Sequence, residues 1–316
     1  MTSLTLPASG SDRDTHGADC GVVIVTHNSA EDLPGLLQSL RIANAGITNH
    51  VVVVDNASHD ESVAVARAHG ATCIELGANL GYAAAINVGR RFVRGCRALL
   101  VLNPDTRVDQ GALRRLLAAL ADPTVGIAVP RLVGSDGATL QSLRREPSIS
   151  RAFGDALLGG RWQRRPSWFS EIVRDRDTYD RARDVEWATG AALAVSRHCN
   201  ELLGPWNEDF FLYSEEVEYA ARVRAAGMRI RYVPDAVVVH REGGSGRSDR
   251  LVALTAVNRV RYYRGRHRRT STGVFTAMVL LHETVRSRRS AHRASLRAVL
   301  TRKAPSEVLQ LEGRCA

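Results

Sequence analysis

The stretch Leu99-Leu100-Val101-Leu102-Asn103-Pro104-Asp105-Thr106 runs from an apolar segment directly into a polar tip. A continuous Leu- and Val-rich run of this length is typical of a strand buried on both faces of a parallel sheet. Pro104 has no N–H group and cannot extend a central strand, so the strand is expected to end before it. Asp105 then lies just outside the carboxyl end of the sheet, where open α/β sheets bind ligands and where a carboxylate can hold a hard cation. Taken alone, the tip is better explained as a turn before a helix predicted over residues 110–120.

Short apolar runs on either side of this stretch predict an alternation of strands and helices. Five runs share this character and are predicted as strands: residues 22–26, 51–54, 73–76, 98–102 and 125–132. Segments with helical spacing of apolar residues separate them, which indicates βαβ units and a parallel sheet. A last pair of strands is predicted at residues 230–233 and 236–239. Residues 144–184 are Arg-rich with little periodicity and are predicted as a long loop or small insertion near the site. The fold class is therefore α/β, a mostly parallel sheet flanked by helices.

Polar side chains follow three of these strands where each one ends, at Thr26-His27-Asn28, Asp55-Asn56 and Asn103-Pro104-Asp105. A fourth polar segment, Gly77-Ala78-Asn79-Leu80-Gly81, precedes a helix predicted at residues 82–94. Right-handed crossovers bring the carboxyl ends of parallel strands to one edge, so these residues are expected to lie together. They are either unrelated turns or a nucleotide site, and their repetition favours the nucleotide site. The absence of GxGxxG and GxxxxGK[ST] argues against a dinucleotide site and a phosphate loop.

Three glutamates in Glu215-Glu216-Val217-Glu218 open a helix predicted to run to Gly227. Acidic residues in a first helical turn complement the helix dipole, which explains their sign. The dipole does not explain why they directly follow the aromatic run Phe210-Phe211-Leu212-Tyr213. His240 ends the last predicted strand, and a single histidine in that position is more often a surface residue than a ligand.

Positive charge is concentrated at the C-terminal end of the chain. Residues 241–316 hold 17 Lys and Arg against five Asp and Glu, whereas residues 1–240 hold 26 against 28. The asymmetry suggests an anionic partner, either a membrane surface or a nucleic acid, but an aromatic content of 5% weakens a base-stacking role. We predict a disordered leader at residues 1–19, a main domain at 20–248 and a basic helical region at 249–316. The basic helices suit an anionic membrane surface, and packing on the main domain is a nearly equal alternative.

The cysteines and the hydropathy pattern bear on location. Five cysteines, without CxxC spacing, fit a reducing compartment and no cysteine-ligated zinc. Residues 1–20 lack the apolar core of a signal peptide, and no run approaches the roughly 18–20 apolar residues that span a bilayer. A cytoplasmic protein is expected, possibly peripheral on the inner face of the plasma membrane.

An ordered set of motifs carries a family resemblance. It comprises VVIVTHN, VVVVDNASHD, GANLGYAAAIN, VLNPDT, WATGAAL, FFLYSEEVEYAARVRAAG and VVVHREGGS. In order and spacing, over residues 21–265, the set resembles the inverting family 2 glycosyltransferases of GT-A fold, in particular the rhamnosyltransferase-like branch. The resemblance implies a nucleotide-sugar donor, a divalent cation (Mg²⁺ or Mn²⁺), and a glycan or polyprenyl-diphosphate-linked acceptor in cell-wall or lipid-linked synthesis.

The same resemblance assigns roles position by position. The residues implied to bind the nucleotide sugar are Thr26, Asn28, Asp55, Asn79, Gly81, Asn103 and Asp105. Asp105 and His240 are the implied metal ligands, with Asn103 standing where the family's DXD-type motif has its first Asp. Glu216 matches the catalytic base, which is Asp in the family's Glu-Asp-x-Asp motif.

The implied reaction is transfer of a sugar, with L-rhamnose from dTDP-rhamnose as the leading candidate, with inversion at the anomeric carbon. Glu216 would take the proton of the acceptor hydroxyl, and the cation at Asp105 would neutralise the departing diphosphate. Alternatives are a UDP-sugar donor, a sugar-phosphate nucleotidyltransferase, and a non-catalytic nucleotide or nucleic-acid binder. The rim carboxylates argue against the last, and no nucleic-acid partner is expected.

Overall fold

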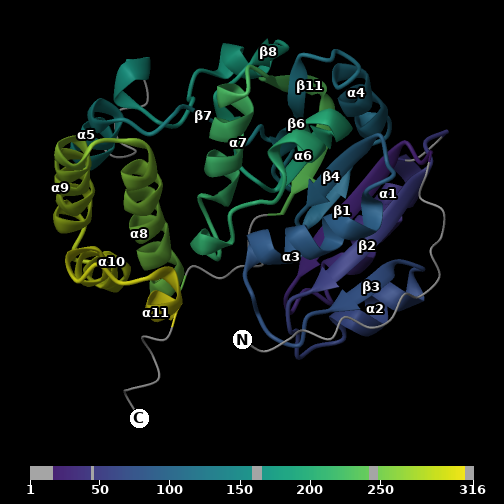
Figure 1. The fold of residues 1–316 in the computed structure, drawn as a ribbon, viewed down its shortest axis with the longest axis horizontal. Helices are drawn as coiled ribbons and strands as arrows, with labels where there is room; N and C mark the ends of the chain where they lie inside the picture. Colours follow the sequence, from purple (N-terminus) through teal and green to yellow (C-terminus); the bar gives the residue numbers. More distant parts are fainter. Residues whose placement is uncertain (1–16, 44–45, 159–165, 242–247, 310–316) are drawn as a thin grey trace.

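The computed structural model describes residues 17–43, 46–158, 166–241 and 248–309 (Figure 1). The predicted leader falls almost entirely outside these ranges, as do most of the glycine-rich segment after His240 and the last residues of the chain, including Cys315. The sheet with its helices and a group of C-terminal helices lie side by side in Figure 1.

The centre of the protein is a mixed, mostly parallel sheet. Its strands lie in the order β3 (Thr72–Glu75), β2 (Asn49–Asp55), β1 (Cys20–Thr26), β4 (Ala98–Leu102), β10 (Ala192–Ser196), β6 (Val125–Val133), β11 (Arg229–His240) and β5 (Thr106–Val108), with β8 (Arg183–Asp184) also paired to β11. The pairs β3–β2, β2–β1, β1–β4 and β6–β11 are parallel, whereas β10 is antiparallel to both of its neighbours. This arrangement confirms the predicted α/β class and the five strands predicted before residue 133.

The register of the sheet brings the strand ends to one edge. Thr26 at the end of β1 is paired with Asp55 at the end of β2. On the other side of β1, Ile24 is paired with Leu102, so Asn103 follows at the same edge. Neighbouring strands lie about 4.8 Å apart, so three polar strand ends stand side by side as the crossover argument predicts.

Both faces of the sheet are covered by helices with an apolar stripe. One core layer packs α1 (Leu33–Ala43), α2 (Ser62–Ala68) and α4 (Ala112–Ala119) on the sheet, and the other packs α3 (Tyr82–Gly89), α6 (Arg197–Leu203) and α7 (Glu215–Ala225). In α1, Leu33, Leu36 and Leu40 recur at helical spacing and are fully buried. Burial of one such leucine contributes roughly 1.5–3 kcal/mol, so the two layers fix the sheet on which the strand ends stand.

The predicted last pair of strands is wrong, because β11 is one strand from Arg229 to His240. Its pairing with β6 shifts register between Val233 and Val237, and this bulge absorbs Pro234, which cannot donate to the ladder. The carbonyl of Pro234 instead accepts a hydrogen bond from the Arg131 side chain at 2.9 Å. The strand therefore continues past the proline and delivers His240 to the sheet edge.

The segment at residues 144–184 is more regular than predicted. It holds α5 (Ile149–Leu158), the short helices η2 (Ser167–Phe169) and η3 (Arg176–Tyr179), and β8, while β7 (Leu143–Arg144) pairs with β9 (Trp187–Ala188). Helix α5 buries Ala152, Gly154 and Ala156. These small residues give a weak apolar signal in the sequence, because the helix packs on α9 rather than on the sheet.

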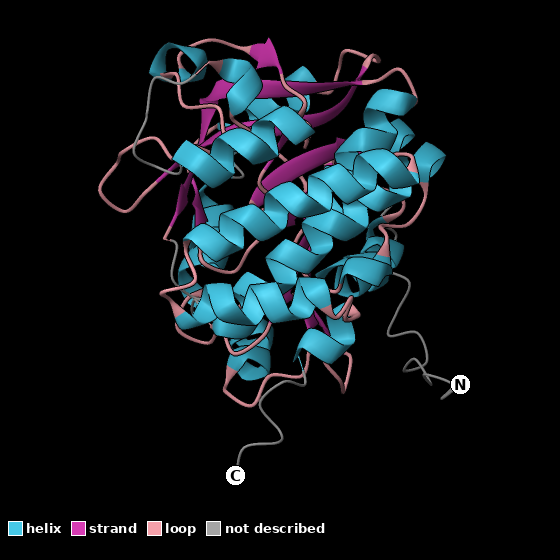
Figure 2. Cartoon of the chain, turned by 90° about the vertical axis from the view of Figure 1, so that its left-hand side faces the viewer, coloured by secondary structure: helices cyan, strands magenta, loops and turns pink. Residues whose placement is uncertain are grey.

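The C-terminal helices form a third apolar cluster beside the sheet. The helices α8 (Asp249–Arg266), α9 (Arg269–Val285), α10 (Ser290–Leu300) and α11 (Pro305–Leu309) gather around Leu254, Phe275 and Ala298, and Ala152 of α5 joins them. Figure 2 shows helices covering this side of the molecule. Within the described ranges, no helix combines the length and the hydropathy that a membrane span requires.

Candidate active site

The nucleotide-side residues begin at the ends of β1 and β2. Thr26 and Asp55 are buried, and Thr26 Oγ1 and Asp55 Oδ1 have no hydrogen-bond partner among the described residues. The other carboxyl oxygen of Asp55 accepts a hydrogen bond from the Ser58 backbone N–H at 3.0 Å, which fixes the direction of the carboxylate. A buried polar atom without a partner costs about 1–3 kcal/mol, a cost that a ligand removes when it binds. Asp55 is therefore oriented and has one oxygen to offer.

Two of the predicted nucleotide residues shape the loops around this edge. Asn28 adopts a positive φ of 52°, and its side-chain oxygen accepts a hydrogen bond from the His59 N–H at 2.8 Å. Asn79 is exposed, and its side-chain oxygen accepts a hydrogen bond from the Gly81 N–H at 3.1 Å. A residue that sequence reasoning missed, the buried Asn56, joins the two loops by accepting the Leu80 N–H at 2.8 Å.

Gly81 marks a close approach between two backbone segments. Its φ is +91°, and a Cβ atom built there would lie 2.4 Å from the carbonyl oxygen of Phe211. The same carbonyl accepts the Tyr82 N–H at 2.6 Å. The glycine therefore lets the start of α3 lie against the loop that leads to Glu215 and Glu216.

Tyr82 lies between Asn103, which follows β4, and Gly190, which borders Glu216 at the start of α7. Its hydroxyl donates to the side-chain oxygen of Asn103 at 2.8 Å and lies 3.4 Å from the carbonyl oxygen of Gly190. Burial raises the pKa of Tyr82 well above its ordinary value, and the negative charges of Glu215, Glu216 and Asp105 raise it further. One hydroxyl is thus within electrostatic reach of three carboxylates from separate segments. The sequence motif that begins at Gly81 contains Tyr82, but nothing in the sequence singles out its hydroxyl.

Asp105 and His240 meet at the next strand end. His240 Nε2 lies 3.3 Å from Asp105 Oδ2, because β11 and β5 pair antiparallel with His240 opposite Thr106. Asp105 Oδ1 is buried and has no partner within the described part of the chain. One carboxylate and one imidazole, with a carboxylate oxygen still free, suit Mn²⁺ or Mg²⁺ completed by diphosphate oxygens and water. The residues present therefore fit the cation that the resemblance implies.

The acidic residues at the start of α7 differ in how far they reach solvent. Glu215 is 3% exposed, whereas Glu216 is partly exposed. Each has one buried carboxyl oxygen, Oε2, without a hydrogen-bond partner in the described ranges. The Cβ of Glu216 lies 3.6 Å from the position of a Cβ built on Gly190, so Gly190 borders Glu216 without a steric need for glycine. Of the two glutamates, Glu216 is the more exposed to solvent.

Burial raises the pKa of both glutamates and so favours their protonated forms. It raises the pKa of Glu215 well above the usual range, with the Glu216 charge as the second cause. Burial is also the first cause of the raised pKa of Glu216, and Arg144 on β7 acts in the opposite direction. A carboxylate whose pKa moves toward neutrality is a better proton acceptor at physiological pH. Arg144 is a neighbour of the site that the sequence alone did not reveal.

The loop before α7 is held in a strained shape by the C-terminal helices. Phe211, Tyr213 and Ser214 all have positive φ, between 63° and 73°. The buried side-chain amide of Asn258 on α8 donates to the carbonyls of Phe210, Leu212 and Tyr213 at 2.8–3.0 Å. A positive φ is uncommon for residues other than glycine and persists where the surroundings fix it. Asn258 is part of what fixes it, and the sequence gives no signal for this role.

The site contains the groups that a transfer reaction with an anionic leaving group requires. Oxygens without protein partners, on Thr26, Asp55 and Asp105, stand along one sheet edge. Glu216, a partly exposed carboxylate with a raised pKa, borders Gly190, whose carbonyl oxygen lies 3.4 Å from the Tyr82 hydroxyl. Such a site can bind a cation with a diphosphate and can take a proton from a nucleophile.

Solved structures share this fold. One is GalNAc-T7 with UDP, GalNAc and Mn²⁺, with a TM-score of 0.59 and 16% identity over 90% of this chain and 56% of that chain. Another is the mannosyltransferase PcManGT from Pyrobaculum calidifontis with GDP-Man and Mn²⁺, with a TM-score of 0.52 and 18% identity over 93% of this chain and 79% of that chain. At these identities the likeness establishes the fold, which is that of the GT-A glycosyltransferases.

Sequence relatives then identify the family. The Glycosyl transferase family 2 profile matches residues 21–178. The N-acetylglucosaminyl-diphospho-decaprenol L-rhamnosyltransferase of Mycobacterium tuberculosis H37Rv is 32% identical over 256 residues, 76% of this chain and 82% of that protein. The dTDP-rhamnosyl transferase RfbF of Shigella flexneri is 23% identical over 78% of this chain and 77% of that protein. The chain belongs to glycosyltransferase family 2 and is a glycosyltransferase.

Proposed function

We propose that the protein is an inverting rhamnosyltransferase that moves L-rhamnose from dTDP-rhamnose to a hydroxyl of a polyprenyl-diphosphate-linked glycan. The donor proposal is supported by two relatives whose names specify rhamnosyl transfer, at 32% and 23% identity. The acceptor proposal is supported by the first of them, whose name specifies an N-acetylglucosaminyl-diphospho-decaprenol. The observation that carries the chemistry is the position of the Tyr82 hydroxyl, which donates to Asn103 at 2.8 Å and lies 3.4 Å from the carbonyl oxygen of Gly190, the residue that borders Glu216.

Glu216 is the proposed base because it is the more accessible carboxylate of the acidic turn. The acceptor oxygen forms a bond to the anomeric carbon as the bond from that carbon to the diphosphate breaks, and its proton passes to Glu216. Attack from the face opposite the leaving group inverts the anomeric centre. Glu215, which burial holds closer to its protonated form, shapes the pocket wall and takes no proton from the acceptor.

Asp105 and His240 are the proposed ligands of Mg²⁺ or Mn²⁺. Bound there, the cation supplies charge neutralisation for the departing nucleoside diphosphate. Asp55, oriented by Ser58, is proposed to accept the imide N–H of thymine, because a carboxylate only accepts hydrogen bonds and its Oδ1 has no partner among the described residues. Thr26 and the loops fixed by Asn28, Asn79 and Gly81 border the nucleotide, and Asn103 is held by Tyr82 beside the diphosphate.

A donor panel tests the proposal. Purified protein with Mn²⁺ and a polyprenyl-diphosphate N-acetylglucosamine acceptor is assayed for nucleoside diphosphate release from dTDP-rhamnose, UDP-glucose and UDP-N-acetylglucosamine, with the product anomer assigned by NMR. We expect acceptor-dependent release from dTDP-rhamnose and an inverted product. A faster reaction with a UDP-sugar would show that the donor is a UDP-sugar and not dTDP-rhamnose. Formation of pyrophosphate from dTTP and rhamnose 1-phosphate would instead establish a nucleotidyltransferase.

We also propose that the basic C-terminal region holds the enzyme on the inner, anionic face of the plasma membrane, where a polyprenyl acceptor resides. A hollow of about 200 Å³ between α8, α10 and α11 has an apolar floor at Val257, Val260 and Val299 and a basic rim. The charged residues that line it are Arg261, Arg264, Arg302 and Lys303, together with the acidic Glu307. Leu300, which is 65% exposed, adds apolar surface nearby on α10. Apolar surface beside clustered basic charge is the combination that binds anionic lipid surfaces.

Liposome sedimentation tests this second proposal. We expect binding to phosphatidylglycerol vesicles that weakens with salt, because screening shortens the reach of surface charge. The variant R264E/R302E should lose it, whereas R41E/R91E, with the same charge change on α1 and after α3, should bind nearly as wild type. Equal loss in both variants would show a general charge effect without a site, and no binding by wild type would remove the proposal.

A further inference from the structure

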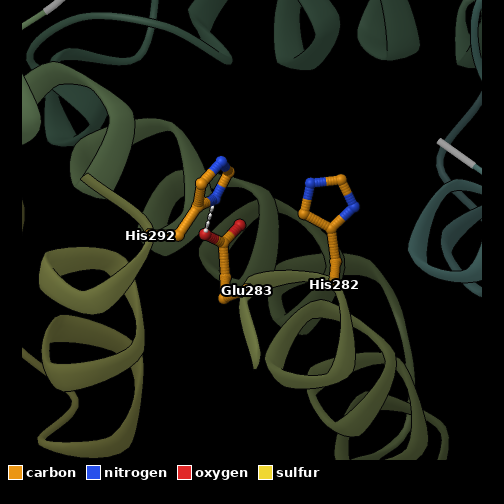
Figure 3. Close-up of side chains that lie close together, drawn as sticks. All are labelled: His282, Glu283 and His292. Atoms are coloured by element: carbon orange, nitrogen blue, oxygen red, sulfur yellow. Dashed lines mark hydrogen bonds and ion pairs between the residues drawn. The ribbon is translucent and has the colours of Figure 1, made fainter. Parts of the chain in front are cut away.

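Three metal-binding side chains lie together in the C-terminal helices, far from the sheet edge in the chain. His282 and Glu283 are neighbours near the end of α9, and His292 is in the first turn of α10. One ligand atom from each lies within 4.8 Å of the others (Figure 3). We infer that His282, Glu283 and His292 form a zinc site that joins α9 to α10, separate from the cation site at Asp105 and His240.

The donor set favours zinc over magnesium. Two imidazoles and one carboxylate suit Zn²⁺ and related transition metals, whereas Mg²⁺ prefers oxygen ligands. Zinc binds three protein ligands with water in the fourth position, at about 2.0–2.2 Å from nitrogen and oxygen. Glu283 is 6% exposed, and the side chain of His292 is 15% exposed, so the ligands are largely removed from bulk water. The centres of the two imidazole rings are 6.0 Å apart, a separation at which one ion can contact both.

His282 is already oriented as a metal ligand is. Its Nδ1 lies 3.2 Å from the carbonyl oxygen of Asp155 on α5, and a carbonyl only accepts, so Nδ1 carries the proton. The other ring nitrogen then holds a lone pair, and Figure 3 shows it facing the space beside Glu283 and His292. A backbone carbonyl that fixes the tautomer of a ligating histidine is a recurring feature of zinc sites.

Glu283 and His292 supply the remaining ligands. His292 Nδ1 lies 2.7 Å from Glu283 Oε2, a hydrogen-bond distance. Two ligands of one tetrahedral zinc ion lie about 3.3 Å apart, so these atoms need to separate by only about 0.6 Å to bind it. Two arginine side chains near the cluster make their contacts elsewhere. Arg259 pairs with Glu171 at 2.7 Å, and Arg286 donates to the carbonyls of Asp155 and Ala156 at 3.0 Å. The ion would therefore join α9, α10 and, through Asp155, α5.

Zinc titration of the full-length protein tests the site without reference to activity. Chelator-treated D105N protein, which lacks the principal ligand of the sheet-edge site, is titrated with Zn²⁺ by calorimetry and by thermal unfolding. We expect one equivalent of Zn²⁺ to bind and raise Tm, while Mg²⁺ at the same concentration does not. Co²⁺ should give the visible absorption of a four-coordinate nitrogen- and oxygen-ligated ion.

Two independent variants and a control complete the test. In the D105N background, H282Q keeps an N–H for Asp155 and H292Q keeps one for Glu283, so each retains the local hydrogen bond while losing an imidazole. Each should weaken Zn²⁺ binding by at least about 100-fold with circular dichroism unchanged. H267Q, which removes a histidine stacked on Tyr263 in the same helical group, should bind as its parent does. Unchanged binding in H282Q and H292Q, or none in D105N, would show that Glu283 and His292 form only an ion pair.

Discussion

Asn258 shows most clearly how single side chains far from the chemistry shape this site. Its amide hydrogen atoms meet backbone carbonyls in the turn before α7, and its removal leaves those carbonyls without that donor. Thr26, Asp55 and Asp105 were identifiable from the sequence because each follows a strand. Asn258, Tyr82 and Arg144 were not, because their positions depend on how separate elements pack together.

The stability of the protein should depend on pH through Glu215. Its pKa is raised on folding by burial, so the folded state holds this proton to higher pH than the unfolded chain does. Stability is then lost as pH rises from the ordinary carboxyl range, near about 4.3, through the folded pKa. Glu215→Gln should therefore raise the unfolding free energy at pH 7–8, and the gain should shrink as pH falls toward 4.

Urea unfolding of metal-free protein at several pH values measures this effect. The exposed Glu201, which pairs with Arg197 on α6, provides the control Glu201→Gln. A gain for Glu215→Gln that is the same at pH 4 and pH 8 would contradict the proposed burial of a titrating carboxyl.

The Tyr82 hydroxyl should contribute to turnover. Tyr82→Phe removes the 2.8 Å hydrogen bond to Asn103 and leaves the ring in place. Loss of one such bond costs about 1 kcal/mol, so we expect kcat/KM to fall about fivefold to tenfold with little change in Tm. Tyr263→Phe, which removes a hydroxyl bonded to Ser271 in the helical group, should leave kcat/KM within about twofold. An equal fall of kcat/KM in the two variants would contradict a specific role of the Tyr82 hydroxyl in turnover.

At the scale of elements, the meeting of α3 and the turn before α7 is the critical contact. Gly81→Ala adds an atom 2.4 Å from the Phe211 carbonyl oxygen, whereas Gly77→Ala, also at positive φ, meets no atom within 4 Å. A left-handed backbone costs a residue with a side chain about 1–2 kcal/mol. The penalty at Gly81 is larger, because its φ of 91° with ψ of 170° lies in a region almost restricted to glycine. We expect Gly77→Ala to lower stability by about 1–2 kcal/mol and keep activity, and Gly81→Ala to lose more stability and most activity. Urea unfolding and initial rates measure the difference, and indistinguishable variants would contradict the contact.

Helix α8 should act on the site through Asn258. Asn258→Ser removes an amide whose two N–H groups are shared among three carbonyls, so at about 1 kcal/mol per hydrogen bond we expect about 2 kcal/mol lower stability. Because the freed turn precedes Glu216, kcat should fall about tenfold or more while the KM for donor changes little. Asn200→Ser, which removes a buried amide bonded to Arg90, is the matched control and should lower stability with kcat within about twofold. A stability loss without a kcat difference from the control would make Asn258 purely structural.

Elements whose apolar pattern faces the sheet were predictable, and those that face other helices were not. The strands at residues 22–26 and 98–102 and the leucine stripe of α1 follow the spacing that burial against a sheet requires. Helix α5 buries mainly alanine and glycine against α9, so its periodicity is weak. Two strands were predicted at residues 230–233 and 236–239, but a bulge accommodates Pro234 within one strand.

At the scale of the whole molecule, charge is distributed unevenly between two parts of the chain. The nearly neutral first 240 residues carry the carboxylates of the sheet edge, and the basic remainder forms the helices around Leu254 and Phe275. Hydrogen bonds link these helices to the turn before α7, through Asn258, and to α5, through His282 and Arg286. The basic region and the sheet are therefore expected to unfold together. Neither the ties nor the cluster of His282, Glu283 and His292 could be read from spacing, because they join segments that meet only in the folded chain.

The most direct test of the account is Glu216→Gln, because the proposed division of labour separates donor binding from proton transfer. Glu218→Gln, which alters a glutamate paired with Arg222 at 3.0 Å in the same helix, is the control. We expect Glu216→Gln to bind dTDP-rhamnose with Mn²⁺ as wild type does by calorimetry, while turnover falls about 10²–10⁴-fold, the usual contribution of a general base. Turnover within tenfold of wild type, or an equal loss of donor binding, would contradict the assignment of Glu216 as the base.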